Sequence, residues 1–195
     1  MSNHLDRTAF PLGRYLTLGD LCTCTQTYKR YRDSIDPFPR SLESFEALKS
    51  LCTELVDPII DHFGRDQFEL TYGFCSVDLK RFLAQKDPET GLKNGRVAPH
   101  HDQHMAHEIN RKGKYFCDRL GAAVDFRIRN CSSDTVVQWI VDQPLPFDSL
   151  YYYGEQRPLH ISSGPQHKQK IWAFTPQGTQ HDGGQSVGLL EALKD

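Results

Sequence analysis

The strongest hydrophobic pattern in the chain lies in residues 41–64. Apolar side chains recur there at positions 42, 45, 48, 51, 52, 55, 56, 59 and 60, the spacing of one helix face. Ser41 can cap the first turn, and Gly64 supplies a stop signal. We therefore predict the main helix over residues 41–64, with a kink or a break at Pro58, which has no amide hydrogen.

Shorter patterns elsewhere predict a mixture of strands and helices. Alternating or continuous apolar runs favour strands at residues 67–74, 120–129, 149–153, 158–162 and 169–175. Short helices are expected at 76–85 and 132–141, whereas the Thr-, Tyr-, Arg- and Pro-rich residues 23–40 predict a loop. Two segments have little pattern: the polar residues 86–117, expected to form an inserted loop, and a C-terminal tail at 176–195 ending in a short helical LLEALK. The mixture predicts an α+β fold.

Composition is consistent with a single compact domain spanning residues 1–195, which the motifs described below identify as a candidate metal-binding domain. The chain has 38% apolar residues, enough for a core, and a net charge of −2 with both signs mixed along it. That balance argues against nucleic-acid binding by bulk charge, and no polybasic run or apolar stretch of about 20 residues suggests a membrane. The first residues, MSNHLDRTAF, lack the features of a secretory signal, so we expect a cytoplasmic protein.

The six cysteines are expected to be reduced in such a compartment. Cys22 and Cys24 form a C-x-C, which is tighter than the usual C-x-x-C of zinc sites. We interpret them as packing thiols.

Histidines concentrate in one short segment. The segment PHHDQHMAHE interleaves them with two acids, and its candidate groups are His100, His101, Asp102, His104, His107 and Glu108. Imidazole and carboxylate are ligands that zinc accepts, so this segment is either a polar exposed loop or a source of metal ligands.

Two further residues are chemically out of place in apolar surroundings. Asp125 interrupts the strand pattern GAAVDF, and a buried carboxylate needs a cation, hydrogen bonds or a metal. The alternative to a metal is an ion pair with a nearby arginine: Arg119, Arg127 or Arg129. His160 lies in the short strand PLHIS, where it is either a metal ligand or a core histidine bonded to backbone.

In order, these segments resemble a known family. The chain has LVDPIIDHFG at 55–64, LTYGFCS at 70–76, DQHM at 102–105, GAAVDF at 121–126 and DSLYYYGEQRPLHIS at 148–162. The set resembles the zinc D-Ala-D-Ala carboxypeptidases and related peptidoglycan peptidases, whose fold the hedgehog signalling domain shares. The resemblance implies a small antiparallel sheet flanked by helices that binds one Zn²⁺.

The resemblance also implies the ligands. Asp125 and His160 match the family's second and third zinc ligands directly. The family spacing places the first ligand at Asp118, whereas the family's S-x-H pattern matches His104 and requires an insertion between His104 and Asp125. We prefer His104 because imidazole is the commoner zinc ligand.

The chain departs from the family at its substrate-binding and proton-transfer positions. The arginine that grips the substrate carboxylate is replaced by Cys75, and Arg81 is the nearby cation that could substitute. The general-base glutamate is missing from its position; Glu155 is the acid nearest to His160, and Glu108 is a remote alternative. Tyr153 occupies the aligned register and could contact the substrate, for example as an oxyanion donor.

Three functions are consistent with this pattern. The first is a zinc-dependent hydrolase of an amide or peptide-like small substrate. The second is a metal-dependent enzyme on the same scaffold with different chemistry on a small metabolite or nucleotide. The third is a non-catalytic module that a metal stabilises.

Overall fold

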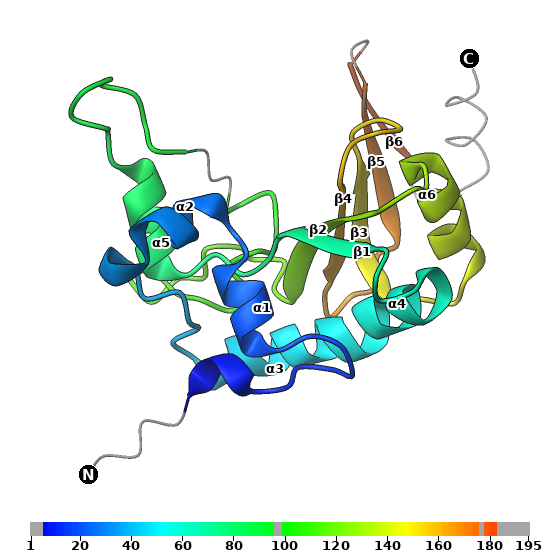
Figure 1. Cartoon of the computed structure of the whole chain (residues 1–195), viewed down its shortest axis with the longest axis horizontal. Coiled ribbons are helices and arrows are strands. Elements are labelled where there is room, and N and C mark those ends of the chain that lie inside the picture. The colour runs from blue at the N-terminus through cyan, green and yellow to red at the C-terminus, as the bar shows by residue number, and fades with distance from the viewer. Residues whose placement is uncertain (1–5, 96–98, 176–177, 183–195) are drawn as a thin grey trace.

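A six-stranded mixed sheet organises the computed structural model, which describes residues 6–95, 99–175 and 178–182 (Figure 1). The strand order is β1-β2-β4-β3-β5-β6. The strands are β1 (Phe68–Tyr72), β2 (Ala122–Ile128), β3 (Phe147–Tyr152), β4 (Leu159–Ser163), β5 (Lys170–Thr175) and β6 (Gly178–Asp182). Each of the strands predicted from sequence is present, and β6 adds an edge strand within the segment expected to be a tail.

The α+β class is confirmed, but the sheet is not wholly antiparallel. Neighbouring strands pair antiparallel except β3 and β5, which run parallel. The reason is the short connection 164–169, which carries the chain from β4 past the end of β3. There the His167 ring donates to the Pro146 carbonyl and the Gln169 N–H donates to the Phe147 carbonyl. Because β5 runs opposite to β4, it is parallel to β3.

The predicted main helix forms in three consecutive pieces: α3 (Leu42–Leu51), the π-helical turn η3 (Cys52–Val56) and α4 (Asp57–Phe63). The Ser41 side chain caps α3 by accepting the Ser44 N–H. Gly64 ends α4 with a positive φ of 93°. The expected break at Pro58 takes the form of the π turn just before it, so the helical path continues although Pro58 cannot donate.

The other helices are short. They are α1 (Leu18–Thr23), α2 (Gln26–Tyr31), α5 (Val77–Ala84) and α6 (Ser133–Asp142), with 3₁₀ turns η1 (Arg7–Ala9) and η2 (Arg32–Ser34). The predictions of α5 and α6 are confirmed. The Ser132 side chain caps α6 by accepting the Thr135 N–H. The loop predicted at 23–40 is wrong for α2. Thr25 caps that helix, and Tyr28 and Tyr31 pack on a small apolar cluster beside α5, contacts that a six-residue segment cannot reveal by periodicity.

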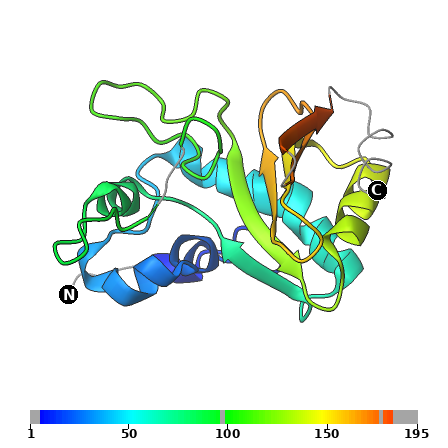
Figure 2. The ribbon, with the colours of Figure 1, turned by 90° about the horizontal axis from the view of Figure 1, so that it is seen from above.

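The main core lies between the long helix and one face of the sheet. Fully buried side chains from both sides meet there: Leu48, Leu51, Leu55, Val124, Phe126, Leu150, Leu159 and Ile161. α2 and α5 lie at one end of the molecule and α6 at the other (Figures 1 and 2). The opposite face of the sheet does not contact this helix and carries a different set of side chains, described below.

Three further findings concern the rest of the chain. Residues 86–95 and 99–121 contain no helix or strand, as predicted for the inserted loop, and the helix expected at LLEALK lies outside the described residues. All six cysteines lie within the described residues and are free thiols. None of the described helices has the length and apolar character needed to cross a bilayer.

Candidate metal centre

One lateral row of the sheet carries the candidate site. Paired positions run from Tyr72 to Asp125, on to His160, then to Tyr151 and finally to Trp172. Laterally paired residues point to the same face of a sheet. The sequence neighbours of the last four all belong to the core against α3, so the row faces the other way.

His104 reaches this face from the inserted loop. Its backbone carbonyl accepts the Cys75 N–H at 2.8 Å, which ties the loop to the segment after β1. The preceding side chain, Gln103, donates to the Leu120 and Ser163 carbonyls at 2.8 and 3.0 Å. These bonds fix the His104 backbone against the sheet.

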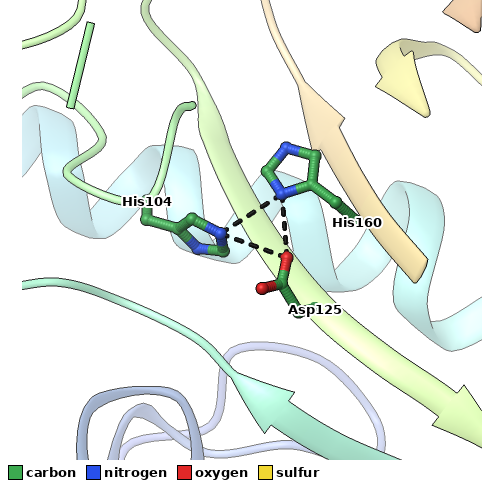
Figure 3. Close-up of side chains that lie close together, drawn as sticks. All are labelled: His104, Asp125 and His160. Atoms are coloured by element: carbon green, nitrogen blue, oxygen red, sulfur yellow. Dashed lines mark hydrogen bonds and ion pairs between the residues drawn. The ribbon is translucent and has the colours of Figure 1, made fainter. Parts of the chain in front are cut away.

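His104, Asp125 and His160 converge on one point (Figure 3). Asp125 Oδ1 lies 3.2 Å from His104 Nε2 and 2.8 Å from His160 Nδ1, and the two ring nitrogens are 3.2 Å apart. The imidazoles are almost fully buried, whereas the Asp125 side chain keeps 30% of its surface exposed. A loop and two antiparallel strands therefore present three ligand atoms together.

The tautomer of His104 is fixed by its other nitrogen. Nδ1 lies 2.8 Å from the Gly73 carbonyl, which can only accept, so Nδ1 carries a hydrogen, and in the neutral ring Nε2 keeps the lone pair that a metal ion would bind. His160 is oriented differently: its ring stacks on Tyr151 at 4.4 Å and 16°, and its buried Nε2 has no hydrogen-bond partner among the described residues.

The charges of the group are strongly coupled. Burial alone would lower the pKa of His104, but the Asp125 carboxylate outweighs burial and raises it. Burial would raise the pKa of Asp125, yet the two imidazoles hold it well below its usual range. Burial lowers the pKa of His160 despite its bond to Asp125. Three acceptor atoms this close need a proton or a cation between them.

The group fits a zinc ion. Tetrahedral zinc with bonds of about 2.0–2.2 Å holds its ligand atoms roughly 3.3 Å apart, close to the separations of 2.8–3.2 Å in this group. The Gly73 carbonyl supplies the outer hydrogen bond that a ligating histidine normally makes. The three side chains could therefore hold one metal ion, and their nitrogen and oxygen donors suit zinc among others.

No protein-family model, curated protein sequence or solved structure matches this chain. The relationship to zinc peptidases stays a hypothesis, based on the order of motifs in the chain.

The ligand group lies in the wall of a cavity of about 790 Å³. Its other lining residues come from the inserted loop and from β1, β3 and β5: Tyr72, Cys75, His100, His101, Asp102, Arg119, Tyr151, Tyr153, Trp172 and Phe174. Burial raises the pKa of the Cys75 thiol to about 12, so this side chain is neutral and not a nucleophile at physiological pH.

Of the two candidates for the first ligand, the structure brings His104 to Asp125 and His160, whereas Asp118 is exposed and outside the group. Tyr153, the candidate substrate-binding residue, lines the cavity.

The residues predicted to transfer a proton or to bind the substrate carboxylate lie outside the cavity. Glu155 is exposed in the turn between β3 and β4 and does not line the cavity. Its carbonyl accepts the Ser133 N–H at 2.9 Å, which ties this turn to the start of α6. Arg81 pairs with Asp78 on α5, also outside the cavity. Glu108 is buried and accepts from Ser44 Oγ and from the Arg40 N–H, so it is a structural carboxylate.

Two cavity residues, Asp102 and Arg119, lie in positions that the sequence did not assign to them. Asp102 is a half-buried acid whose Oδ1 accepts the His104 N–H at 3.3 Å. Arg119 donates to the His101 carbonyl, Ser149 Oγ and Tyr151 Oη, and it forms no ion pair within the described part of the chain. The adjacency of Asp102 to His104 was a usable signal, whereas nothing in the sequence places Arg119 beside β3.

Proposed function

We infer that this protein is a zinc-dependent hydrolase of an amide or peptide-like small substrate. The observation that carries the proposal is the convergence of His104 Nε2, Asp125 Oδ1 and His160 Nδ1 in the wall of a large cavity. Two imidazoles and one carboxylate leave a fourth tetrahedral position open, as catalytic zinc sites do. The motif order that resembles zinc D-Ala-D-Ala carboxypeptidases supports the same class of reaction.

A zinc ion in this group would polarise the substrate carbonyl and make a water molecule a stronger nucleophile. Hydrolysis of an amide also needs a group that takes a proton from water and delivers it to the leaving amine. Asp102 and Asp125 are the carboxylates among the described lining residues, and Asp125 belongs to the ligand group. Asp102 therefore transfers the proton in this proposal.

Arg119 supplies positive charge to the same cavity. Its guanidinium is held by the His101 carbonyl, 2.6 Å from Nη2, and by Ser149 Oγ, 2.9 Å from Nη1. A cation fixed in this way, without a neutralising acid among the described residues, favours negative charge that develops on a substrate oxygen.

The first test concerns the metal. Elemental analysis should find about one zinc per chain after incubation with zinc and desalting. His104→Ala, Asp125→Ala and His160→Ala should each lose it, while His100→Ala, an exposed histidine of the same cavity, should keep it. Zinc at 100 times its Kd should raise the Tm by roughly 5–10 °C. Retention of zinc by all three ligand variants would exclude this site.

The second test concerns the reaction. The zinc-loaded protein should cleave members of a panel of D- and L-dipeptides and simple amides. Asp102→Asn should lower kcat by about 10²–10⁴-fold with zinc content unchanged. Bound zinc without turnover of any panel member would argue against a hydrolase and favour other metal chemistry or a binding module.

A further inference from the structure

One wall of the cavity is built from aromatic side chains. Tyr151 and Tyr153 alternate with core residues along β3 and just beyond it, and Trp172 and Phe174 do the same on β5. β3 and β5 are parallel and in register, with Tyr151 opposite Trp172. We call these four side chains the aromatic wall.

Three rings of the aromatic wall form a continuous surface that begins at His160, one of the candidate metal ligands. Tyr151 stacks on His160 at 4.4 Å and meets Phe174 edge-on at 5.6 Å and 74°. Phe174 in turn stacks on Tyr153 at 5.1 Å and 19°. A group bound beside the metal ligands would therefore extend directly onto ring surface.

Apolar surface at the end of this wall is open. Tyr153 is 43% exposed, and Trp172 and Phe174 are only partly buried. Exposed aromatic surface inside a concave site is a common feature of ligand-binding pockets. A substrate with only methyl side chains would leave most of this surface uncovered.

Charge and polarity divide the cavity along β3. Arg119 is bonded at Ser149 and Tyr151, on the side of the loop that carries His101 and Asp102. Tyr153 lies two positions further along the chain, where it stacks on Phe174. The polar groups that handle the reacting amide are thus at one end, and the aromatic surface is at the other.

We propose that the aromatic wall binds an aromatic ring of the substrate, next to the bond that is cleaved. This inference rests on the proposed hydrolase and names its substrate class: amides or peptides with an aromatic side chain beside the scissile bond. A sugar fits less well, because its many hydroxyls need hydrogen-bonding side chains and this wall presents mainly ring surface. The Tyr151 hydroxyl is already bonded to the His101 carbonyl. The cavity volume of about 790 Å³ is within the range of pockets that hold drug-sized ligands.

The test compares two chelating probes on the full-length, zinc-treated protein by calorimetry. Acetohydroxamic acid presents a methyl group, and phenylacetohydroxamic acid presents a ring on the same metal-binding head. The phenyl probe should bind about tenfold more tightly, the gain expected of an added aromatic contact. Tyr153→Ala and Phe174→Ala should each bring the ratio of the two affinities toward one. Trp139→Phe, which alters a ring packed on His62 and Phe63 outside the cavity, should keep the ratio.

The outcomes separate this inference from the proposed function. Equal affinities in the unmodified protein, or a tenfold ratio that survives both alanine variants, would overturn the aromatic wall as a binding surface. If the protein takes up no zinc, acetohydroxamic acid will not bind and the hydrolase proposal fails. The ring protons of the phenyl probe should then still show saturation transfer from the protein that Tyr153→Ala removes, and absence of that transfer would overturn this inference as well.

Discussion

At the scale of single residues, Gly121 is the position with the least freedom. It joins the inserted loop to β2 with a φ of +82°, and its N–H donates to His107 Nε2 at 3.1 Å. A Cβ at this position would lie 2.0 Å from the Ser163 carbonyl oxygen, far inside contact distance. Both the backbone conformation and the close approach of β4 therefore require glycine.

We expect Gly121→Ala to lower the free energy of unfolding by more than about 3 kcal/mol, since a positive φ alone costs about 1–2 kcal/mol and the clash adds to it. Gly113→Ala is the matched control, because Gly113 has a φ of +72° but no atom within 4 Å of the added Cβ. Urea denaturation of both variants measures the difference. Equal losses would mean that the approach of Ser163 is unimportant.

Single residues also show where the sequence was informative. An acid within GAAVDF was recognisable because a carboxylate among small apolar residues needs a partner. Asp118 could not be excluded by spacing, since the length of the insertion before β2 is not encoded in any local pattern. Glu155 lies outside the cavity although it is close to His160 in sequence, because the turn that carries it is tied to the start of α6.

At the scale of elements, the inserted loop is fixed to the start of α3 by a buried carboxylate. Glu108 is 2% exposed, and its Oε1 accepts from Ser44 Oγ and from the Arg40 N–H, both at 2.9 Å. Ser44 Oγ in turn accepts the His107 N–H at 3.2 Å. These bonds hold the loop against the start of α3 on the C-terminal side of His104.

Glu108→Ala should destabilise the fold by about 1–3 kcal/mol, because two buried donors lose their acceptor. It should also weaken zinc binding by about 10-fold or more, since His104 lies in the released loop. Glu108→Gln keeps an acceptor oxygen and should retain most of both. Glu46→Ala, an exposed acid of α3, is the control. Zinc affinity by competition with a chelating dye would test this, and an unchanged affinity in Glu108→Ala would show that the loop holds its shape without this bond.

Elements were predictable where a pattern repeats. Several helical turns of apolar spacing identified α3 and α4, and shorter helical patterns identified α5 and α6. The parallel pairing of β3 with β5 was not predictable, because an apolar strand pattern does not state which neighbour it will pair with. The same limit applies to the aromatic wall, whose strands are adjacent in space only through that pairing.

At the scale of the whole molecule, the reactivity of the cysteine thiols depends on how deeply the fold buries them. Cys22, Cys52, Cys75 and Cys117 are buried, and burial raises the pKa of Cys75 to about 12 and that of the partly buried Cys24 to about 11. At pH 8 less than about one in 500 of either thiol is ionised, and the thiolate is the reactive form. Cys131 is partly exposed at the start of α6.

Iodoacetamide at pH 8 should therefore modify Cys131 first in the folded protein. Modification of the full set of six thiols should require denaturation. Peptide mass spectrometry after timed quenching gives the order. Modification of Cys75 as fast as Cys131 would indicate that the cavity opens widely in solution, since Cys75 lines it.

The lateral row from Tyr72 to Trp172 has a consequence for assembly of the fold. Asp125 and His160 face each other only in the register observed, and sliding either strand by one residue would turn its ligand toward the helices. A metal ion bound there would stabilise the correct pairing of segments far apart in sequence, and it would not stabilise a sheet with a shifted register. Protein refolded in the presence of a chelator should therefore contain more misfolded molecules than protein refolded with zinc.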